Sequence, residues 1–134
     1  MKIVGIGTDI IEIARIARLL EGGNERFLQR VLHAGERARY DALNPALAAG
    51  WLAKRWATKE ACAKALGTGI GQHAQLNEIE TRHDVLGKPE LVLHGVTLAT
   101  AQRLGVSDLA LSLADEYSHA VAFVVLTGAE ERQT

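Results

Sequence analysis

Glu60 and Lys64 stand four positions apart near the end of a long helical pattern. Side chains at this spacing share one face of a helix, one turn apart. Residues 67–71 follow with three glycines, the first of which is a typical helix stop. A carboxylate can hold a hard cation, a lysine can meet a phosphate oxygen, and glycines let phosphates approach the backbone. The segment predicts a site for a metal-bound phosphorylated ligand; the alternative is a surface ion pair beside an ordinary helix end.

A second acidic residue, Asp9, follows a short apolar run near the N-terminus. Residues 3–7 predict a buried strand, and apolar residues at helical spacing predict a helix over 10–20. The glycines of this run do not make a dinucleotide-binding fingerprint, because Ile10 stands where the third glycine is required. Asp9 is therefore expected at a strand-to-helix junction, either as a simple helix N-cap or as another carboxylate of the ligand site.

The fold that must hold these groups mixes helices and strands. Apolar periodicity predicts a short helix capped by Asn24 and further helices over 35–43 and 96–104. The longest helix is predicted over 46–66 and would span about 30 Å. Strands are predicted at 78–83, 90–94, 108–114 and 120–126, the last two forming a hairpin. Since helices and strands do not alternate strictly, we expect an α+β fold with a largely antiparallel sheet packed on the long central helix.

Composition places further bounds on the protein. The chain has 134 residues, 48% apolar and 23% charged, so we expect one domain over 1–127 and a loose tail over 128–134. A net charge of −1 argues against a protein that coats nucleic acid, and no run suggests a signal peptide or a membrane span. The single cysteine, Cys62, fits a reducing cytoplasm and is expected to be a packing residue. The five histidines show no metal-binding spacing, so we expect ordinary polar residues.

Residues 15–39 carry a local excess of positive charge. Six arginines stand against three glutamates in this segment. Two interpretations remain open, a solvated face and a docking surface for an acidic partner. The arginines are Arg15, Arg18, Arg26, Arg30, Arg37 and Arg39.

Three stretches together resemble a known family. They are G-I-G-T-D-I-I-E-I at 5–13, W-A-T-K-E-A-C-A-K-A-L-G-T-G-I-G at 56–71, and L-G-K-P at 86–89. They resemble the short bacterial holo-[acyl-carrier-protein] synthases, the stand-alone 4′-phosphopantetheinyl transferases, over nearly the whole chain. The resemblance implies the fold of that family and a magnesium-dependent transfer of phosphopantetheine from coenzyme A to a serine of apo acyl carrier protein. It also implies release of 3′,5′-ADP and a place in fatty acid biosynthesis.

The resemblance also assigns roles to residues of the site. It implies that Asp9 and Glu60 are the Mg²⁺ ligands, with pyrophosphate oxygens and waters completing the shell. Lys64 would be the third catalytic residue and would contact the pyrophosphate. The residues expected to contact coenzyme A are Arg55, Lys64, Gly67, Thr68 and Gly69.

Carrier protein and subunit contacts are implied in the same way. The family docks its carrier at positions that match Arg15, Arg26, Phe27 and Arg30. Its members form trimers with the active site at a subunit boundary, so we expect coenzyme A, acyl carrier protein and further copies of this chain as partners. Neither nucleic acid nor a membrane is expected. The apolar run 120–126, expected to be buried on both faces, is predicted to form part of the subunit boundary.

One departure from the family pattern concerns the general base. Many members carry a histidine near the active site on the penultimate strand, in a Ser-x-Ser-His run, and Ala114 stands at that place here. The remaining candidates are a magnesium-bound water or hydroxide, Glu60 acting through a water, and Asp115.

Two other functions compete with phosphopantetheine transfer. One is a magnesium-dependent pyrophosphohydrolase that acts on a nucleotide, with water as the nucleophile. The other is a carrier-binding module without catalysis. A mixture of coenzyme A, magnesium and apo carrier protein separates the three, because only transfer adds mass to the carrier.

Overall fold

The computed structural model describes residues 1–130. Its elements in chain order are β1 (Lys2–Glu12), α1 (Ile13–Leu20), α2 (Glu25–Val31), α3 (Ala34–Asp41), η1 (Pro45–Leu47), α4 (Ala48–Ala65), η2 (Leu76–Glu78), β2 (Ile79–His83), β3 (Pro89–Leu93), α5 (Gly95–Arg103), β4 (Val106–Asp115) and β5 (His119–Gly128). Gly128, expected to begin a loose tail, instead ends β5. Residues 131–134 of that tail lie outside the described part.

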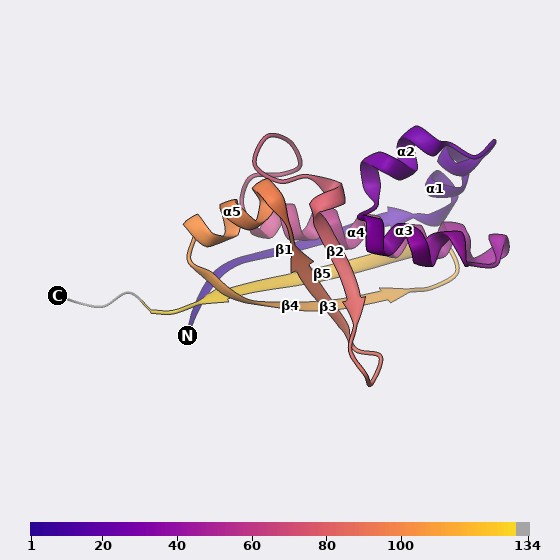
Figure 1. Ribbon diagram of the computed structural model, residues 1–134. Coiled ribbons are helices and arrows are strands. Elements are labelled where there is room, and N and C mark those ends of the chain that lie inside the picture. Colours follow the sequence, from indigo (N-terminus) through magenta and orange to yellow (C-terminus); the bar gives the residue numbers. More distant parts are fainter. Residues whose placement is uncertain (131–134) are drawn as a thin grey trace.

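The strands pair antiparallel, as predicted, but they form two sheets and not the single sheet that was expected. β5 lies between β1 and β4 in a three-stranded sheet, and β2 pairs with β3 in a separate hairpin. Figure 1 shows the three long strands side by side, with the turn of the β2–β3 hairpin pointing away from them. The predicted C-terminal hairpin is confirmed, since β4 and β5 are adjacent and antiparallel.

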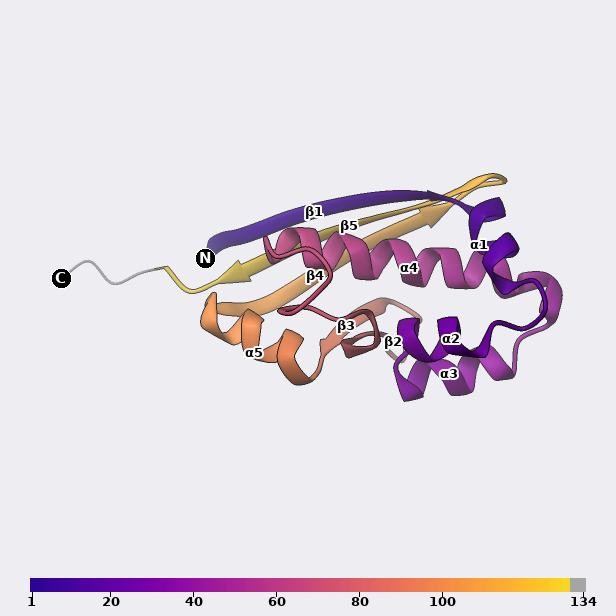
Figure 2. The same cartoon turned by 90° about the horizontal axis from the view of Figure 1, so that it is seen from above.

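The helix α4 is the element on which the other elements pack. Figure 2 shows it along the three-stranded sheet, with the β2–β3 hairpin, α2, α3 and α5 on its other side. The predicted long helix over 46–66 is confirmed as an 18-residue α-helix, preceded by the 3₁₀ turn η1. No helix within residues 1–130, α4 included, combines the length and the apolar character needed to span a membrane.

Two glycines let β1 lie directly on α4. A Cβ atom at Gly7 would overlap the carbonyl oxygen of Ala61, and one at Gly5 would overlap that of Ala65. Residues two apart on a strand point to the same side of the sheet, so Asp9 also points toward α4. The close approach of strand to helix therefore brings the carboxylate of Asp9 to the helix that carries the other candidate residues.

The strand β1 is longer than predicted. Ile10 is 66% exposed and Ile11 is 4% exposed, which is the alternation of a strand and not of a helix. The prediction of a helix over 10–20 is wrong in its first residues, because α1 begins only after Glu12. Asp9 is thus a strand residue, and the N-cap alternative is wrong: Glu12 occupies that position and makes no side-chain cap.

The face of the three-stranded sheet that points away from α4 is apolar and exposed. Residues of β5 alternate between buried and exposed, so the expectation that 120–126 is buried on both faces is wrong for the single chain. Partners in register across the strands share a face, and on this one Ile10 lies opposite Val121. We call it the outer face and define it by Ile6, Ile10, Val121 and Phe123, which are 59%, 66%, 38% and 45% exposed.

Candidate active site

Asp9 and Lys64 meet between β1 and α4. Lys64 Nζ lies 2.9 Å from Asp9 Oδ1 and donates a second hydrogen bond, of 3.0 Å, to the carbonyl oxygen of Thr8. The Asp9 side chain is 17% exposed and that of Lys64 is 52% exposed. The carboxylate is therefore held in place by the fold, whereas the ammonium group reaches it from the solvent side.

Glu60 lies close to this pair, one helical turn before Lys64. Burial raises the pKa of its carboxyl and the negative charge of Asp9 raises it further, while Lys64 and Arg15 act in the opposite direction. The site thus brings two carboxylates near each other, one of them partly desolvated. Mg²⁺ is typically held by one or two protein carboxylates, with waters and substrate phosphates in its other positions. The donor set fits the predicted magnesium site.

Three amides of the glycine-rich loop after α4 are hydrogen-bonded to the end of the helix. Gly67 and Gly69 have φ angles of 80° and 64°, the left-handed conformation that glycine adopts readily. The amide of Gly67 donates to the carbonyl oxygen of Lys64, and the amides of Thr68 and Gly69 donate to that of Ala63. These bonds close the helix end. These three amides are therefore not free to meet phosphate oxygens in this structure, and the contact of Gly67, Thr68 and Gly69 with coenzyme A stays a prediction.

Arg55 lies on the opposite side of α4 from Lys64. Lys64 follows Arg55 by nine residues, which is two and a half turns of an α-helix, so the two side chains point in opposite directions. Arg55 is 3% exposed, stacks on Trp51 with 4.5 Å to the ring centroid, and its Nε lies 3.4 Å from Glu36 Oε2. Burial lowers the pKa of its guanidinium, and Glu36 acts in the opposite direction. Burial and the stacking on Trp51 favour a packing role, but Nε and Nη2 have no hydrogen-bond partner among the described residues, and the phosphate contact stays a prediction.

Lys59 precedes Glu60 but is fully buried, away from the site. Its Nζ lies 2.6 Å from Glu36 Oε1 and donates to the carbonyl oxygens of Leu76, at 2.9 Å, and Ile79. Burial lowers the pKa of Lys59, and Glu36 opposes that shift. These bonds connect α4 to α3, η2 and β2. They fix the rotation of α4 about its axis, and with it the direction in which Glu60 points.

The predicted docking residues lie on α1 and α2. Phe27 is half-buried, with its ring centroid 6.0 Å from that of Trp56. Arg37, by contrast, pairs with Glu25 and Asp41 and is not free to meet a partner. The predicted docking residues that are exposed are Arg15, Arg26 and Arg30.

The two positions discussed for the general base lie on different faces of the sheet. Ala114 is in register with Val121 and belongs to the outer face. Asp115 is 43% exposed, and its Oδ1 lies 3.8 Å from Lys54 Nζ. Neither position singles out a base, so the three predicted candidates stay open.

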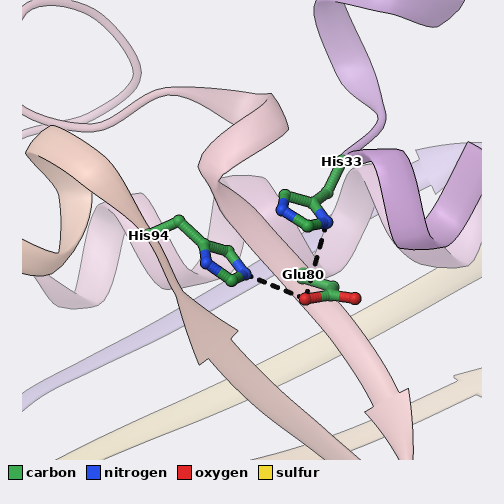
Figure 3. A group of neighbouring side chains, drawn as sticks. All are labelled: His33, Glu80 and His94. Atoms are coloured by element: carbon green, nitrogen blue, oxygen red, sulfur yellow. Dashed lines mark hydrogen bonds and ion pairs between the residues drawn. The ribbon is translucent and has the colours of Figure 1, made fainter.

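Sequence reasoning missed one group of converging side chains. His33, Glu80 and His94 come from the start of α3, from β2 and from the start of α5, and their ligand atoms lie within 4.8 Å of one another (Figure 3). No local spacing signals this group, because three separate elements contribute one residue each. The expectation of ordinary polar histidines therefore overlooked two of the five.

Comparison with known proteins relates the whole described fold to one family. Residues 5–122 match the family model of the 4′-phosphopantetheinyl transferase superfamily. The holo-[acyl-carrier-protein] synthase of Alkalilimnicola ehrlichii is 48% identical over 128 residues, which cover 96% of this chain and 99% of that protein. The enzyme of the same name from Edwardsiella ictaluri is also 48% identical over 128 residues, covering 96% and 100%.

Solved structures show the same architecture. Holo-[acyl-carrier-protein] synthase from Neisseria meningitidis matches with a TM-score of 0.85 and 38% identity, over 93% of this chain and 98% of that one. The Bacillus anthracis protein, solved in complex with CoA (3′,5′-ADP), matches with a TM-score of 0.80 and 36% identity, over 96% and 100%. The predicted α+β fold with an antiparallel sheet on a central helix is thereby confirmed.

Proposed function

The chain belongs to the 4′-phosphopantetheinyl transferase superfamily, and we propose that Asp9, Glu60 and Lys64 carry its reaction. The protein is a transferase of the holo-[acyl-carrier-protein] synthase type, which moves phosphopantetheine from coenzyme A to acyl carrier protein. The observation that carries the residue assignment is the convergence of two carboxylates and one ammonium group between β1 and α4.

The reaction exchanges one phosphorus–oxygen bond for another. The hydroxyl oxygen of the carrier serine bonds to the phosphorus that bears the pantetheine arm, and the bond from that phosphorus to the bridging pyrophosphate oxygen breaks. The serine gives its proton to the general base, for which the three predicted candidates stay open, and 3′,5′-ADP leaves. Because negative charge grows on the leaving phosphate, positive charge held at that place lowers the barrier.

Asp9 and Glu60 would hold Mg²⁺, which when bound supplies positive charge to the pyrophosphate oxygens. Lys64 can supply a second positive charge. Its side chain is 52% exposed, so the ammonium group can turn from Asp9 to a phosphate oxygen of coenzyme A. That movement would also free the Asp9 carboxylate, which the structure holds through β1.

The carrier protein would dock on α1 and α2. Arg15, Arg26 and Arg30 are exposed there, and the first of them lies close enough to Glu60 to influence its pKa. A positive surface beside the carboxylates suits an acidic partner whose serine must reach the pyrophosphate.

We further propose a homotrimer with the active site at the subunit boundary. The outer face supports this assembly, because large apolar side chains gathered on one side of a sheet are typical of a surface that another chain covers. Its residue Ile10 follows Asp9 directly in β1, so a chain packed on the outer face would contact the strand that carries Asp9, although the two side chains point to opposite sides of the sheet.

A cytoplasmic location is part of the same proposal. Cys62 is a free, buried cysteine, and burial raises the pKa of its thiol to about 12. The thiol is therefore an inert packing group, which suits a compartment without disulfide formation.

The decisive experiment mixes the protein with coenzyme A, Mg²⁺ and an apo acyl carrier protein and follows the carrier by mass spectrometry. We expect the carrier to gain the mass of one phosphopantetheine group as 3′,5′-ADP accumulates. Cleavage of coenzyme A without a mass gain would instead indicate a pyrophosphohydrolase. A stable complex with neither product would indicate a binding module.

A further inference from the structure

His33, Glu80 and His94 form a cluster that the transfer reaction does not use, which we call the His–Glu–His cluster. The Nε2 of His94 lies 2.8 Å from Glu80 Oε1, and the Nδ1 of His33 lies 3.5 Å from the same oxygen. Figure 3 shows the two imidazoles on one side of the carboxylate, each with a nitrogen turned toward it. Three potential metal ligands thus converge on one point from three elements.

The atoms of the cluster are ready to bind a cation. The Glu80 side chain is 5% exposed, and its Oε1 lies 3.1 Å from the guanidinium Nη2 of Arg82 and 2.8 Å from His94 Nε2. The carboxylate thus already faces one cation. His33 Nδ1 accepts a hydrogen bond of 3.2 Å from the amide of Gly35. Each imidazole nitrogen has one lone pair, so a metal at Nδ1 would take the place of that hydrogen bond.

We propose that His33, Glu80 and His94 bind a divalent transition-metal ion such as Zn²⁺, with a water in the fourth position. In a tetrahedral zinc shell with bonds of about 2.0–2.1 Å, neighbouring ligand atoms are roughly 3.3 Å apart. The two nitrogen-to-oxygen distances, 2.8 Å and 3.5 Å, lie on either side of that value. Two imidazoles and one carboxylate are a donor set that zinc uses where one position stays open.

Binding requires both rings to rotate out of their stacked arrangement. They are stacked, with centroids 4.1 Å apart and planes 9° apart, whereas a nitrogen lone pair lies in the plane of its ring. The planes must therefore turn until they meet at the metal. The terminal torsion of histidine is broad, and side-chain exposures of 28% for His33 and 32% for His94 leave room for the turn.

Arg82 is the cation that competes for the cluster. Its Nη2 lies 3.1 Å from Glu80 Oε1, the oxygen that the metal would use, and its side chain is 56% exposed. It can therefore move into solvent when a metal binds. The charges deeper in the protein are already paired, since Glu36 contacts both Lys59 and Arg55. Removal of the Arg82 charge should strengthen metal binding.

A metal at this place would fasten three elements to one another. His33 is the N-cap of α3, Glu80 lies in β2, and His94 is the N-cap of α5. These elements lie on the side of α4 that faces away from the three-stranded sheet (Figure 2). A bound metal stabilises whatever state holds its ligands together, so it should raise the unfolding temperature.

The test is a Co²⁺ titration of the chain without a polyhistidine tag, followed by visible absorption. We expect one ion per chain with the intense absorption of a tetrahedral site. The variants His33→Asn, which keeps a side chain able to cap α3, and His94→Gln should each weaken binding at least tenfold, and Arg82→Gln should strengthen it severalfold. The matched control His73→Asn removes an exposed histidine outside the cluster and should bind as the wild type does.

Two further variants separate this site from the proposed magnesium site. Asp9→Asn and Glu60→Gln should keep the Co²⁺ absorption if the His–Glu–His cluster binds the ion. Loss of the signal in these variants, with retention in His33→Asn and His94→Gln, would overturn the proposal, as would equal affinity in all variants. In thermal unfolding, Zn²⁺ should raise the transition of the wild type by roughly 5–10 °C and that of His94→Gln by much less.

Discussion

At the residue scale, Asp9 changes partners during the proposed reaction. In the structure Lys64 neutralises it, and the ammonium group is the more exposed member of the pair. No ion pair of this kind neutralises Glu60 among the described residues. Burial and the charge of Asp9 both raise the pKa of its carboxyl. A divalent cation between the two carboxylates would relieve that repulsion and release Lys64 for the pyrophosphate.

Amide variants test the roles of Asp9 and Glu60. Asp9→Asn and Glu60→Gln keep the side-chain shape and remove the charge, so turnover should fall by about two to three orders of magnitude while the fold persists. Raising Mg²⁺ should partly restore each single variant and restore the double variant less. The measurement is the rate of carrier modification against Mg²⁺ concentration. Rates near that of the wild type in either variant would remove that residue from the site.

The pH dependence of stability tests the electrostatics of Glu60. Because its pKa is raised in the folded state, its contribution to stability is full below its ordinary value and is lost as pH rises through the folded value. Without Mg²⁺, Glu60→Gln should therefore raise the unfolding temperature relative to the wild type at about pH 8 and have less effect at about pH 5. With Mg²⁺ at the higher pH, the wild type should instead have the higher unfolding temperature. An unchanged difference across these conditions would contradict the assignment.

At the scale of elements, the contact between β1 and α4 decides where the catalytic groups meet. The strand backbone rests on the helix because Gly5 and Gly7 carry no side chain at the contact. On the other side of the helix, the buried pair of Lys59 and Glu36 fixes its rotation. The position of Asp9 relative to Glu60 follows from both contacts.

Substitution of Gly7 tests the strand-to-helix contact. In Gly7→Ala the new methyl group would overlap the Ala61 carbonyl, so β1 must move and the free energy of unfolding should fall by about 3 kcal/mol. The control is Gly50→Ala, also on α4, where a Cβ meets nothing within 4 Å. Since alanine favours a helix, that variant should be about 0.5–1 kcal/mol more stable. Chemical denaturation measures both, and equal effects would refute the argument.

Charge reversals test the docking surface of α1 and α2. Arg26→Glu should raise the carrier-protein KM roughly tenfold and leave the coenzyme A KM unchanged, since it replaces an attraction by a repulsion. The effect should shrink at high salt. Arg15→Glu should alter both docking and the site, because Arg15 also influences the pKa of Glu60. Lys88→Glu, a reversal in the distant β2–β3 turn, is the control, and an equal rise of KM there would argue against a specific surface.

At the scale of the whole molecule, the single chain leaves one side of its main sheet uncovered. Helix α4 covers the inner side, and the outer face carries Ile6, Ile10, Val121 and Phe123 in contact with solvent. Apolar side chains in such an arrangement are stabilised when another copy covers them. In the proposed trimer, another copy of the chain would cover the outer face.

A charge on the outer face tests the trimer. Phe123→Glu would place a carboxylate in the proposed boundary, so light scattering should report the monomer mass, and transfer activity should fall as the boundary is lost. Val85→Glu changes another apolar residue, which is fully exposed in the β2–β3 turn, and should keep the trimer. A wild-type protein that scatters as a monomer at working concentration would refute the assembly.

The sequence by itself determined the elements and the chemical types at the site. Helical spacing and short apolar runs located α4, α5 and the four strands of the two hairpins to within a few residues, because both signals reflect which residues are buried. Glu60 and Lys64 were predicted on one helical face because a helix fixes the direction of residues four apart. The family followed from motifs of fixed spacing, and the comparisons confirm it.

Only the tertiary structure decided which residues meet across elements. The backbone contact of Gly7 with Ala61 brings Asp9 to Lys64. No local sequence pattern predicts that these two side chains meet. The extension of β1 through Ile10 depends on pairing with β5, which overrides the local helical spacing. The burial of Arg55 against Trp51 was also decided by packing, because the neighbours of a helix that is buried on both sides set its rotation. The His–Glu–His cluster was invisible in the sequence, since packing alone brings its three elements together.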